Sequence, residues 1–358
     1  MAFGIYIHIP YCLSKCRYCD FHSSGGNGQV SDTYIQAVLH HLKEQNFPQP
    51  DTLYFGGGTP SLLTPQQLAC IIDTVQPVCG AEITLEANPE TLSLPLLQGF
   101  RKAGANRLSL GIQTALDDSL KTLGRPHTTA QSRAAFRMAQ QAGFSNISGD
   151  IMLALPNYTT EEFDQTLSLM VEEGASHISA YLLKIEPGTA FFQNPPANLP
   201  DEDAAADFYL YAVEKLALAG YQQYEISNFS KAGYESRHNL LYWNCEDYLG
   251  IGPGAHSCIK GIRYAFPRDT HGFIAGTAPF SVTGECTWQD YFMLQLRLNT
   301  GLHLPLLQQN YGITLSPAQI QFIQQCQKHN LLHFDGQTIQ LTAQGMLVQN
   351  SILVQLLS

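Results

Sequence analysis

The stretch IYIHIPYCLSKCRYCDF, residues 5–21, joins a short apolar run directly to three closely spaced cysteines. The run that begins at Ile5 is rich in β-branched and aromatic side chains, which is typical of a buried strand. Cys12, Cys16 and Cys19 follow it almost at once. The cysteines therefore fall on one loop at the carboxyl end of the first predicted strand.

The spacing Cys-x3-Cys-x2-Cys indicates an iron–sulfur site, because thiolates are the ligands of such clusters. Three ligands for a four-iron cube leave one iron open to a small molecule. A structural zinc site is the alternative, but it uses four closed ligands, and the nearest spare ones are His8 and His22. Three unrelated free cysteines explain the pattern less well, because chance seldom gathers them on one turn.

The pattern of an apolar run, a turn and an amphipathic stretch recurs over residues 1–225. Further apolar runs begin at Thr52, Ile83, Leu108, Ile147 and Ile178. Helical periodicity lies between them, with Ser31 and Thr64 as expected caps and further helices over 94–103, 129–142, 160–173 and 202–219. Alternating strands and helices predict an α/β fold with a parallel sheet, and six units fit an open, partial (β/α)6 barrel. A doubly wound flat sheet is the alternative.

The unusual residues follow the predicted strands, where parallel α/β folds place their sites. They are Cys12, GGGTP (residues 56–60), Glu86 and Gln113. The glycine-rich turn lacks a following GK[ST], so a phosphate loop is excluded.

The remainder of the chain divides into two parts. Residues 226–280 are rich in Gly, Tyr and Asn, and we expect a connecting segment. Residues 281–358 predict a small, mostly helical, winged-helix-like domain with a hairpin near Asp335. Only Arg297 and Lys328 are cationic in this domain, so it is expected to be structural or to bind a partner other than DNA.

The composition narrows the classes of function. The 358 residues carry a net charge of −11, which argues against nucleic acid or an anionic membrane as the main partner. Nine cysteines, three of them crowded together, indicate metal binding in a reducing compartment. With no signal peptide at the start and no apolar run of about 18 residues, we expect a cytoplasmic protein.

The cysteine motif, with Tyr18 before its last cysteine, resembles the radical S-adenosylmethionine superfamily over about residues 5–270. Within it, the strings YIHIPYC, YFGGGTPSLL, LEANPE, RLSLGIQ, LGRPHT and DIMLALP resemble the oxygen-independent coproporphyrinogen dehydrogenases and their close relatives.

That resemblance implies a 4Fe–4S cluster on Cys12, Cys16 and Cys19, whose open iron would chelate S-adenosylmethionine. A reduced cluster would cleave this cosubstrate to a 5′-deoxyadenosyl radical. The residues implied to bind it are Tyr6, Tyr18, Gly57, Gly58, Thr59, Glu86, Gln113, Arg125 and Asp150. Taken singly, Glu86 and Arg125 are ordinary surface charges, and only the collective match favours the functional interpretation.

Three features separate this chain from the dehydrogenases. Phe21 replaces a further cysteine, the segment before Cys12 is short, and RHNLLYW (residues 237–243) is followed by YLGIGPGAHS. The HNxxYW string resembles the HemW-type haem chaperone branch. This implies haem as cargo and haem-accepting respiratory proteins, membrane-bound ones among them, as partners.

The resemblance implies that haem is bound by His238, Asn239, Tyr242 and Trp243. A neutral imidazole suits haem iron, and the aromatic rings offer flat surfaces to a porphyrin. Alternatively, His238 and Trp243 pack the junction with the C-terminal domain, and His256 is a competing ligand. Cys245 and Cys258 lack a cysteine–proline haem motif and receive no role.

The expected function is therefore a haem chaperone on a radical S-adenosylmethionine scaffold. The alternative is an enzyme, coproporphyrinogen III dehydrogenase, which oxidatively decarboxylates two propionates. Its acidic substrate needs cationic anchors, and the chain has 19 Lys+Arg against 30 Asp+Glu. The sequence leaves open whether radical cleavage is used, and it does not indicate an oligomeric state.

Overall fold

The computed structural model describes residues 2–26 and 28–357. A mixed twelve-stranded sheet lies at its centre, in the order β14-β13-β12-β11-β1-β4-β5-β6-β7-β8-β10-β9. Neighbouring strands from β11 to β8 are parallel. These are β11 (Asp247–Ile251), β1 (Phe3–Ile9), β4 (Thr52–Gly57), β5 (Glu82–Ala87), β6 (Arg107–Gln113), β7 (Asn146–Leu153) and β8 (His177–Leu182). Each apolar run predicted to be a strand is one of them.

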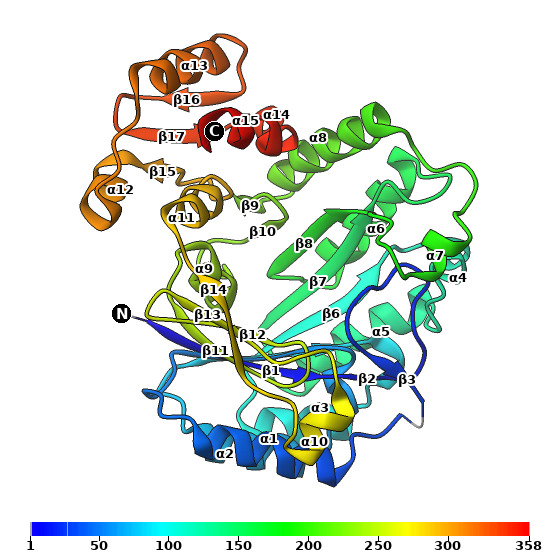
Figure 1. Cartoon of the computed structure of the whole chain (residues 1–358). Coiled ribbons are helices and arrows are strands. Elements are labelled where there is room, and N and C mark those ends of the chain that lie inside the picture. The colour runs from blue at the N-terminus through cyan, green and yellow to red at the C-terminus, as the bar shows by residue number, and fades with distance from the viewer. Residues whose placement is uncertain (1, 27, 358) are drawn as a thin grey trace.

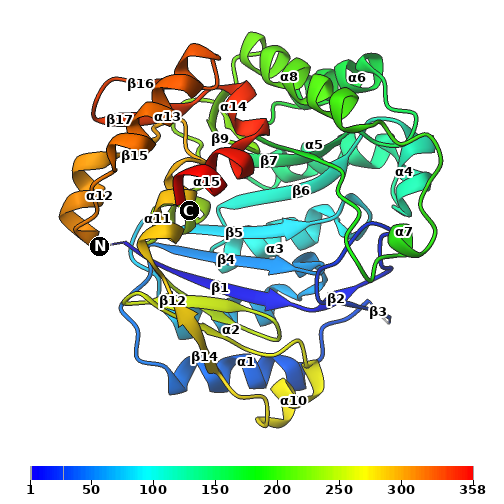
Figure 2. The ribbon, with the colours of Figure 1, turned by 45° about the horizontal axis from the view of Figure 1, so that its top comes forward.

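Helices follow these strands and cover the outer side of a curved, open sheet (Figures 1 and 2). The predicted ones are α1 (Asp32–Glu44), α2 (Pro65–Val75), α3 (Leu94–Ala103), α5 (Thr129–Gln141), α6 (Thr160–Glu172) and α8 (Glu202–Leu218). The structure adds α4 (Asp117–Leu123) and α7 (Ala190–Gln193), both short. The expected α/β partial barrel is confirmed.

Local chemistry explains where the helices begin. The Ser31 hydroxyl accepts a hydrogen bond from the Tyr34 amide, and Thr64 and Gln67 form a reciprocal capping box ahead of α2. Apolar side chains of the parallel strands and of the helix faces bury a continuous core, which includes Ile5 and Phe55. This packing fixes the strand ends, where the unusual residues lie.

Residues 226–280 do not form the connecting segment that we expected, because they extend the sheet at both edges. On one side, β10 (Asn228–Ser230) pairs with β8 and with β9 (Gln222–Glu225). On the other, β11 pairs with β1 and continues through β12 (His256–Ile259), β13 (Ile262–Ala265) and β14 (Ser281–Glu285). Along the chain, α9 (Arg237–Trp243) lies between β10 and β11, and α10 (Thr270–Ala275) lies between β13 and β14. Strands this short carry no clear periodicity, and the partner of β11 is at the opposite end of the sequence.

The C-terminal module has a second apolar core, built from residues between Tyr291 and Leu356. Its helices are α11 (Trp288–Gln295), α12 (Leu304–Tyr311), α13 (Pro317–Lys328), α14 (Ala343–Leu347) and α15 (Gln349–Leu357). A small sheet of β15 (Leu302–His303), β17 (Thr338–Leu341) and β16 (Leu332–Phe334) completes it. Helices followed by a hairpin give the expected winged-helix-like arrangement, although β14 at its predicted start belongs to the large sheet.

The module packs against the barrel through α14 on α8 and α11 on α9. An ion pair crosses this boundary, because Arg297 Nη2 donates to Glu225 Oε2 at 2.8 Å and the Glu225 side chain is fully buried. Within the described part of the chain, no helix is long and apolar enough to cross a membrane.

Candidate functional site

The cysteine loop projects from the carboxyl end of β1. Cys12 lies in β2 (Tyr11–Cys12), which pairs with β3 (Ser24–Gly25) and so closes the base of the loop. Arg17 N donates to the Leu123 carbonyl at 3.0 Å and ties the loop to α4. Cys12, Cys16 and Cys19 are half-buried and line one cavity of about 130 Å³. A set of three thiols facing one enclosed space fits a cubane cluster with one open iron.

The same cavity collects most of the residues predicted for S-adenosylmethionine. Tyr18 comes from the cysteine loop, and the others come from β4 and the turn after it, from β5, β6 and β7, and from the loop after α4. They meet because the ends of parallel strands share one edge. They are Tyr18, Gly57, Gly58, Thr59, Glu86, Gln113, Arg125 and Asp150.

Glu86 is held firmly at the rim of this cavity. Its carboxylate accepts from Tyr54 Oη at 2.8 Å and from the Gly57 amide at 3.1 Å. Desolvation raises the pKa of Glu86 to about 7. Glu86 therefore fixes the position of the glycine-rich turn.

Arg125 links that edge to the cysteine loop. Its Nη1 lies 3.3 Å from Cys16 Sγ, and its Nη2 donates to Asn88 Oδ1 at 3.0 Å and to the Gly111 carbonyl at 2.6 Å. Asn88 in turn donates through Nδ2 to Thr59 Oγ1 at 3.1 Å. One guanidinium thus connects the thiols with two strand ends.

The lining residues that the sequence reasoning missed include Asn88, Ser109, Gly111 and Tyr181. Ser109 donates to Asp150 at 3.0 Å, and Tyr181 Oη donates to Gln113 at 3.0 Å, so these two also orient predicted residues. Side chains alternate along a strand, and Ser109 and Gly111 share the parity of Gln113 on β6. That period of two was the available signal.

The glycines at the end of β4 also pack closely against neighbouring parts of the chain. A Cβ at Gly58 would lie 2.6 Å from the Tyr11 carbonyl oxygen and 2.8 Å from that of Ile9. Gly57 has a φ of 108°. The turn is therefore glycine because it packs against the backbone at the base of the cysteine loop.

Tyr6 does not line this cavity but a second one, which it shares with Gly57 and Glu86. Its hydroxyl hydrogen-bonds to His8 Nδ1 at 3.0 Å, and His8 Nε2 to the His22 carbonyl at 2.8 Å. Burial lowers the pKa of His8 to about 4. His8 is therefore neutral, with both ring nitrogens engaged.

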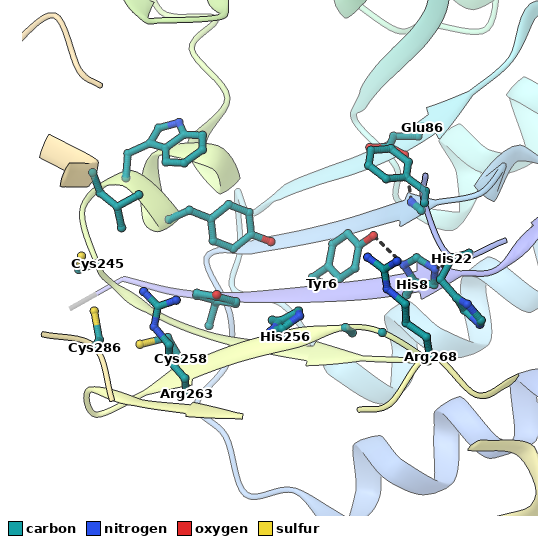
Figure 3. A pocket seen from close by; sticks show the side chains of 18 of the residues that line it. Tyr6, His8, His22, Glu86, Cys245, His256, Cys258, Arg263, Arg268 and Cys286 are labelled. Carbon is teal, nitrogen blue, oxygen red and sulfur yellow. Dashed lines mark hydrogen bonds between the residues drawn. The ribbon is translucent and has the colours of Figure 1, made fainter. Parts of the chain in front are cut away.

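This second cavity has a volume of about 500 Å³, within the range of ligand pockets. It adjoins the first, because Phe21, Gly57 and Glu86 line both. Figure 3 shows Glu86 and His8 at one end and Cys245, Cys258 and Cys286 with Arg263 at the other. Its walls also include Tyr242, Trp243, Tyr248, His256, Arg268, Met293 and Leu294.

His238 does not reach this cavity, which corrects the expectation that it ligates haem. Its side chain is fully buried, and it shares hydrogen bonds of 2.7 Å with both Thr52 Oγ1 and Tyr242 Oη. The ring stacks on Tyr54 at 5.0 Å between centroids, and burial lowers the pKa to about 3. With no ring nitrogen free, His238 holds α9 against the sheet, as in the alternative interpretation.

The other three residues of the HNxxYW motif do not all lie at the larger cavity. Tyr242 and Trp243 line the larger cavity, whereas Asn239 lines neither cavity. The backbone amide of Asn239 donates to Ser236 Oγ, the N-cap of α9, at 3.4 Å. His256 lines the larger cavity and is exposed, and its ring makes no hydrogen bond within the described residues. His256 is therefore better placed than His238 to bind the iron of a haem in this cavity.

Comparisons with known proteins agree with this geometry. Residues 6–170 match the model of the radical SAM superfamily, and residues 287–348 match the HemN C-terminal domain. "Heme chaperone HemW" of Bacillus subtilis is 34% identical over 97% of each chain. The protein of the same name from Escherichia coli is 39% identical over 76% of each chain.

A solved structure has the same fold. It is described as "Coproporphyrinogen III oxidase (HemN) from Escherichia coli is a Radical SAM enzyme", with a TM-score of 0.84 and 21% identity. The match covers 99% of this chain and 90% of the chain in the solved structure. The likeness extends through both the sheet and the C-terminal module.

Proposed function

The chain belongs to the HemW family of radical S-adenosylmethionine proteins, and we propose that it binds haem in its larger cavity and delivers it to acceptor proteins. Membership of this family implies a 4Fe–4S cluster and S-adenosylmethionine, and the smaller cavity has the donor set for both. The cavity next to it supplies the space for the cargo.

The composition of the larger cavity is the observation that carries this proposal. Tyr242, Trp243 and Tyr248 give it aromatic walls, which suit a flat macrocycle. Arg263 and Arg268 give it two guanidinium groups, which suit the two propionates of haem. His256 and three thiols offer ligands to the iron.

The smaller cavity would hold S-adenosylmethionine against the open iron of a cluster on Cys12, Cys16 and Cys19. When bound and reduced, such a cluster would supply one electron to the sulfonium of this cosubstrate. Glu86 and Asp150 are acceptors for its ammonium and ribose hydroxyls, and Arg125 is the cation nearest the thiols. Because Glu86 lines both cavities, the occupant of one lies beside that of the other.

The proposed acceptors are respiratory haem proteins, reached from the cytoplasm. The C-terminal module is the proposed docking surface, because it borders the cavity through Met293 and Leu294 on α11. It has only two cationic side chains, Arg297 and Lys328, and this lack of basic charge separates it from DNA-binding winged helices.

Anaerobic titration of the reconstituted protein with haem tests this function. We expect about one haem per chain with a Soret band, and transfer of that haem to an apo-acceptor. In a parallel sample, coproporphyrinogen III should survive incubation with S-adenosylmethionine and reductant. If coproporphyrinogen III were converted to protoporphyrinogen IX and no haem were bound, the protein would be a coproporphyrinogen III dehydrogenase and not a haem chaperone.

A further inference from the structure

One histidine lies near the middle of the larger cavity with its ring free (Figure 3). We infer that His256 is the axial ligand of the haem iron. The inference deepens the proposed haem-binding function and rests on it. It moves the iron ligand from the HNxxYW motif to the YLGIGPGAHS string that follows it.

The position of His256 along the cavity suits the centre of a porphyrin. The strand β12 begins at His256, and the chain just before it passes His22, because a Cβ at Gly254 would lie 3.6 Å from the Cβ of His22. Further along β12, Cys258 lies at the opposite end of the cavity with the other thiols (Figure 3). The iron is at the centre of the macrocycle, so its ligand must reach the middle of the cavity. His256 meets this condition, whereas the thiols are placed to contact the edge of the ring.

The ring of His256 is free, unlike those of the other histidines at this cavity. His8 has both ring nitrogens hydrogen-bonded, at 3.0 and 2.8 Å. His22 Nε2 lies 3.0 Å from Thr270 Oγ1 and shares a hydrogen bond with it. His256 is exposed, and its ring makes no hydrogen bond to any described residue. A ligand can therefore bind to this imidazole without breaking a contact of the fold.

Two guanidinium groups lie near the ring of His256. Burial, followed by the charges of Arg263 and Arg268, lowers the pKa of this imidazole from its ordinary value. The neutral imidazole is the form that binds a metal ion. Arg263 lies on β13, which pairs with β12 through His256 and Ala265 among others, and Arg268 follows β13. The proposed iron ligand and the cations for the propionates thus belong to one wall of the cavity.

The backbone at His256 is fixed, although its side chain is not. His256 pairs with Ala265 in the sheet, and the next residue, Ser257, accepts a hydrogen bond from the Gly250 amide at 2.8 Å. A Cβ at Gly250 would overlap the His256 carbonyl oxygen, so β11 can lie this close only with glycine there. A fixed backbone limits the freedom that the ligand loses when it binds, which favours affinity.

The tyrosines of the cavity are less suited to bind the iron. Tyr6 Oη hydrogen-bonds to His8 at 3.0 Å. Tyr242 Oη is engaged in the same way by His238, at 2.7 Å. Burial raises the pKa of Tyr248 to about 12, so its phenol stays protonated at neutral pH.

Resonance Raman spectra of the ferrous, haem-loaded protein test the inference, because a histidine ligand gives an iron–nitrogen stretching band. The parent should show this band, and His256→Ala should lose it and bind haem about tenfold more weakly. Added imidazole should restore the band in His256→Ala by occupying the vacated space. His271→Ala is the matched control, because His271 is exposed on α10 and does not line the cavity, and it should behave like the parent.

A second variant keeps the ligand position occupied. His256→Tyr should give a ferric spectrum of the phenolate type, since tyrosine also ligates haem iron. Because the His256 side chain is exposed, the thermal melts of both haem-free variants should match that of the parent.

The outcomes separate the inference from the function on which it rests. An iron–nitrogen band that survives in His256→Ala would overturn the inference and leave the haem-binding function standing. A thiolate-type spectrum in the parent, or an unchanged ferric spectrum in His256→Tyr, would also overturn it. A parent that binds no haem would overturn the proposed function itself.

Discussion

At the scale of single residues, burial and hydrogen bonding decide which histidines and cysteines are free to bind a ligand. His238 has the sequence context of a haem ligand, yet Thr52 and Tyr242 occupy its ring. Cys286 has no motif around it, yet it lines the larger cavity together with Cys245 and Cys258. The sequence identifies the residue types, whereas the contacts made in the fold determine their roles.

The buried state of His238 predicts a pH effect on stability. Its folded pKa, about 3, lies below the ordinary 6.5, so its contribution is complete above pH 6.5 and is lost as pH falls toward 3. One such group gives a slope of up to about 1.4 kcal/mol per pH unit. When the pH falls from about 7 to about 5, the free energy of unfolding should therefore decrease less in the His238→Gln variant than in the parent protein. Denaturant titrations at both pH values measure this, and equal losses in the two proteins would contradict it.

The cluster thiols predict a loss of iron. Cys12→Ala, Cys16→Ala or Cys19→Ala should abolish the roughly four iron and four sulfide expected per chain after reconstitution. Cys70→Ala should not, because Cys70 is exposed on α2. Iron and sulfide analysis measures both, and stoichiometric zinc without sulfide would sink the cluster assignment.

At the scale of elements, alternating runs and caps were enough to predict the parallel strands of residues 1–225 and most helices around them. The fold then brings eight of the nine residues predicted to bind the cosubstrate to one cavity, with Tyr6 as the exception. The strands after Asn228 could not be predicted, because they are short and β11 depends on pairing with β1. The larger cavity was missed for the same reason, since β12 and β13 form one of its walls.

The contact between β4 and the cysteine loop predicts the effect of a glycine substitution. In Gly58→Val the new side chain would displace the Tyr11 backbone, so the cluster should be lost together with cosubstrate binding. Gly26→Val is the control. Gly26 follows β3 at the far end of the cysteine loop, and a Cβ added there would have nothing within 4 Å. Iron content and the cluster spectrum with S-adenosylmethionine measure both. A Gly58→Val protein with a full cluster would show that the turn yields.

At the scale of the whole molecule, the larger cavity lies where the sheet, α9 and the C-terminal module meet. Glu225 on the barrel side is fully buried and also accepts from Asn228, with Arg297 as its cationic partner. Arg297 also lies over the Trp243 ring, 4.3 Å from its centroid. One side chain thus ties the module to both the sheet edge and the cavity wall.

Removal of that cation predicts a large loss of stability. Arg297→Met would leave a buried carboxylate without a charge partner, which costs about 3 kcal/mol or more. Lys328→Met, at the end of α13, removes the same charge from the module and should cost less than about 0.5 kcal/mol. Denaturant titrations compare the two, and similar small losses would mean that the ion pair does not hold the module in place.

The most direct measurement of the central claim is the haem dissociation constant of Arg268→Glu beside that of Lys102→Glu. Arg268 is exposed and lines the larger cavity, whereas Lys102 lies in the last turn of α3, and both substitutions change the net charge equally. If the cavity holds haem and Arg268 faces a propionate, Arg268→Glu should weaken binding by at least about tenfold. Lys102→Glu should bind like the parent. Equal affinities in all three proteins would place the haem elsewhere and contradict the account.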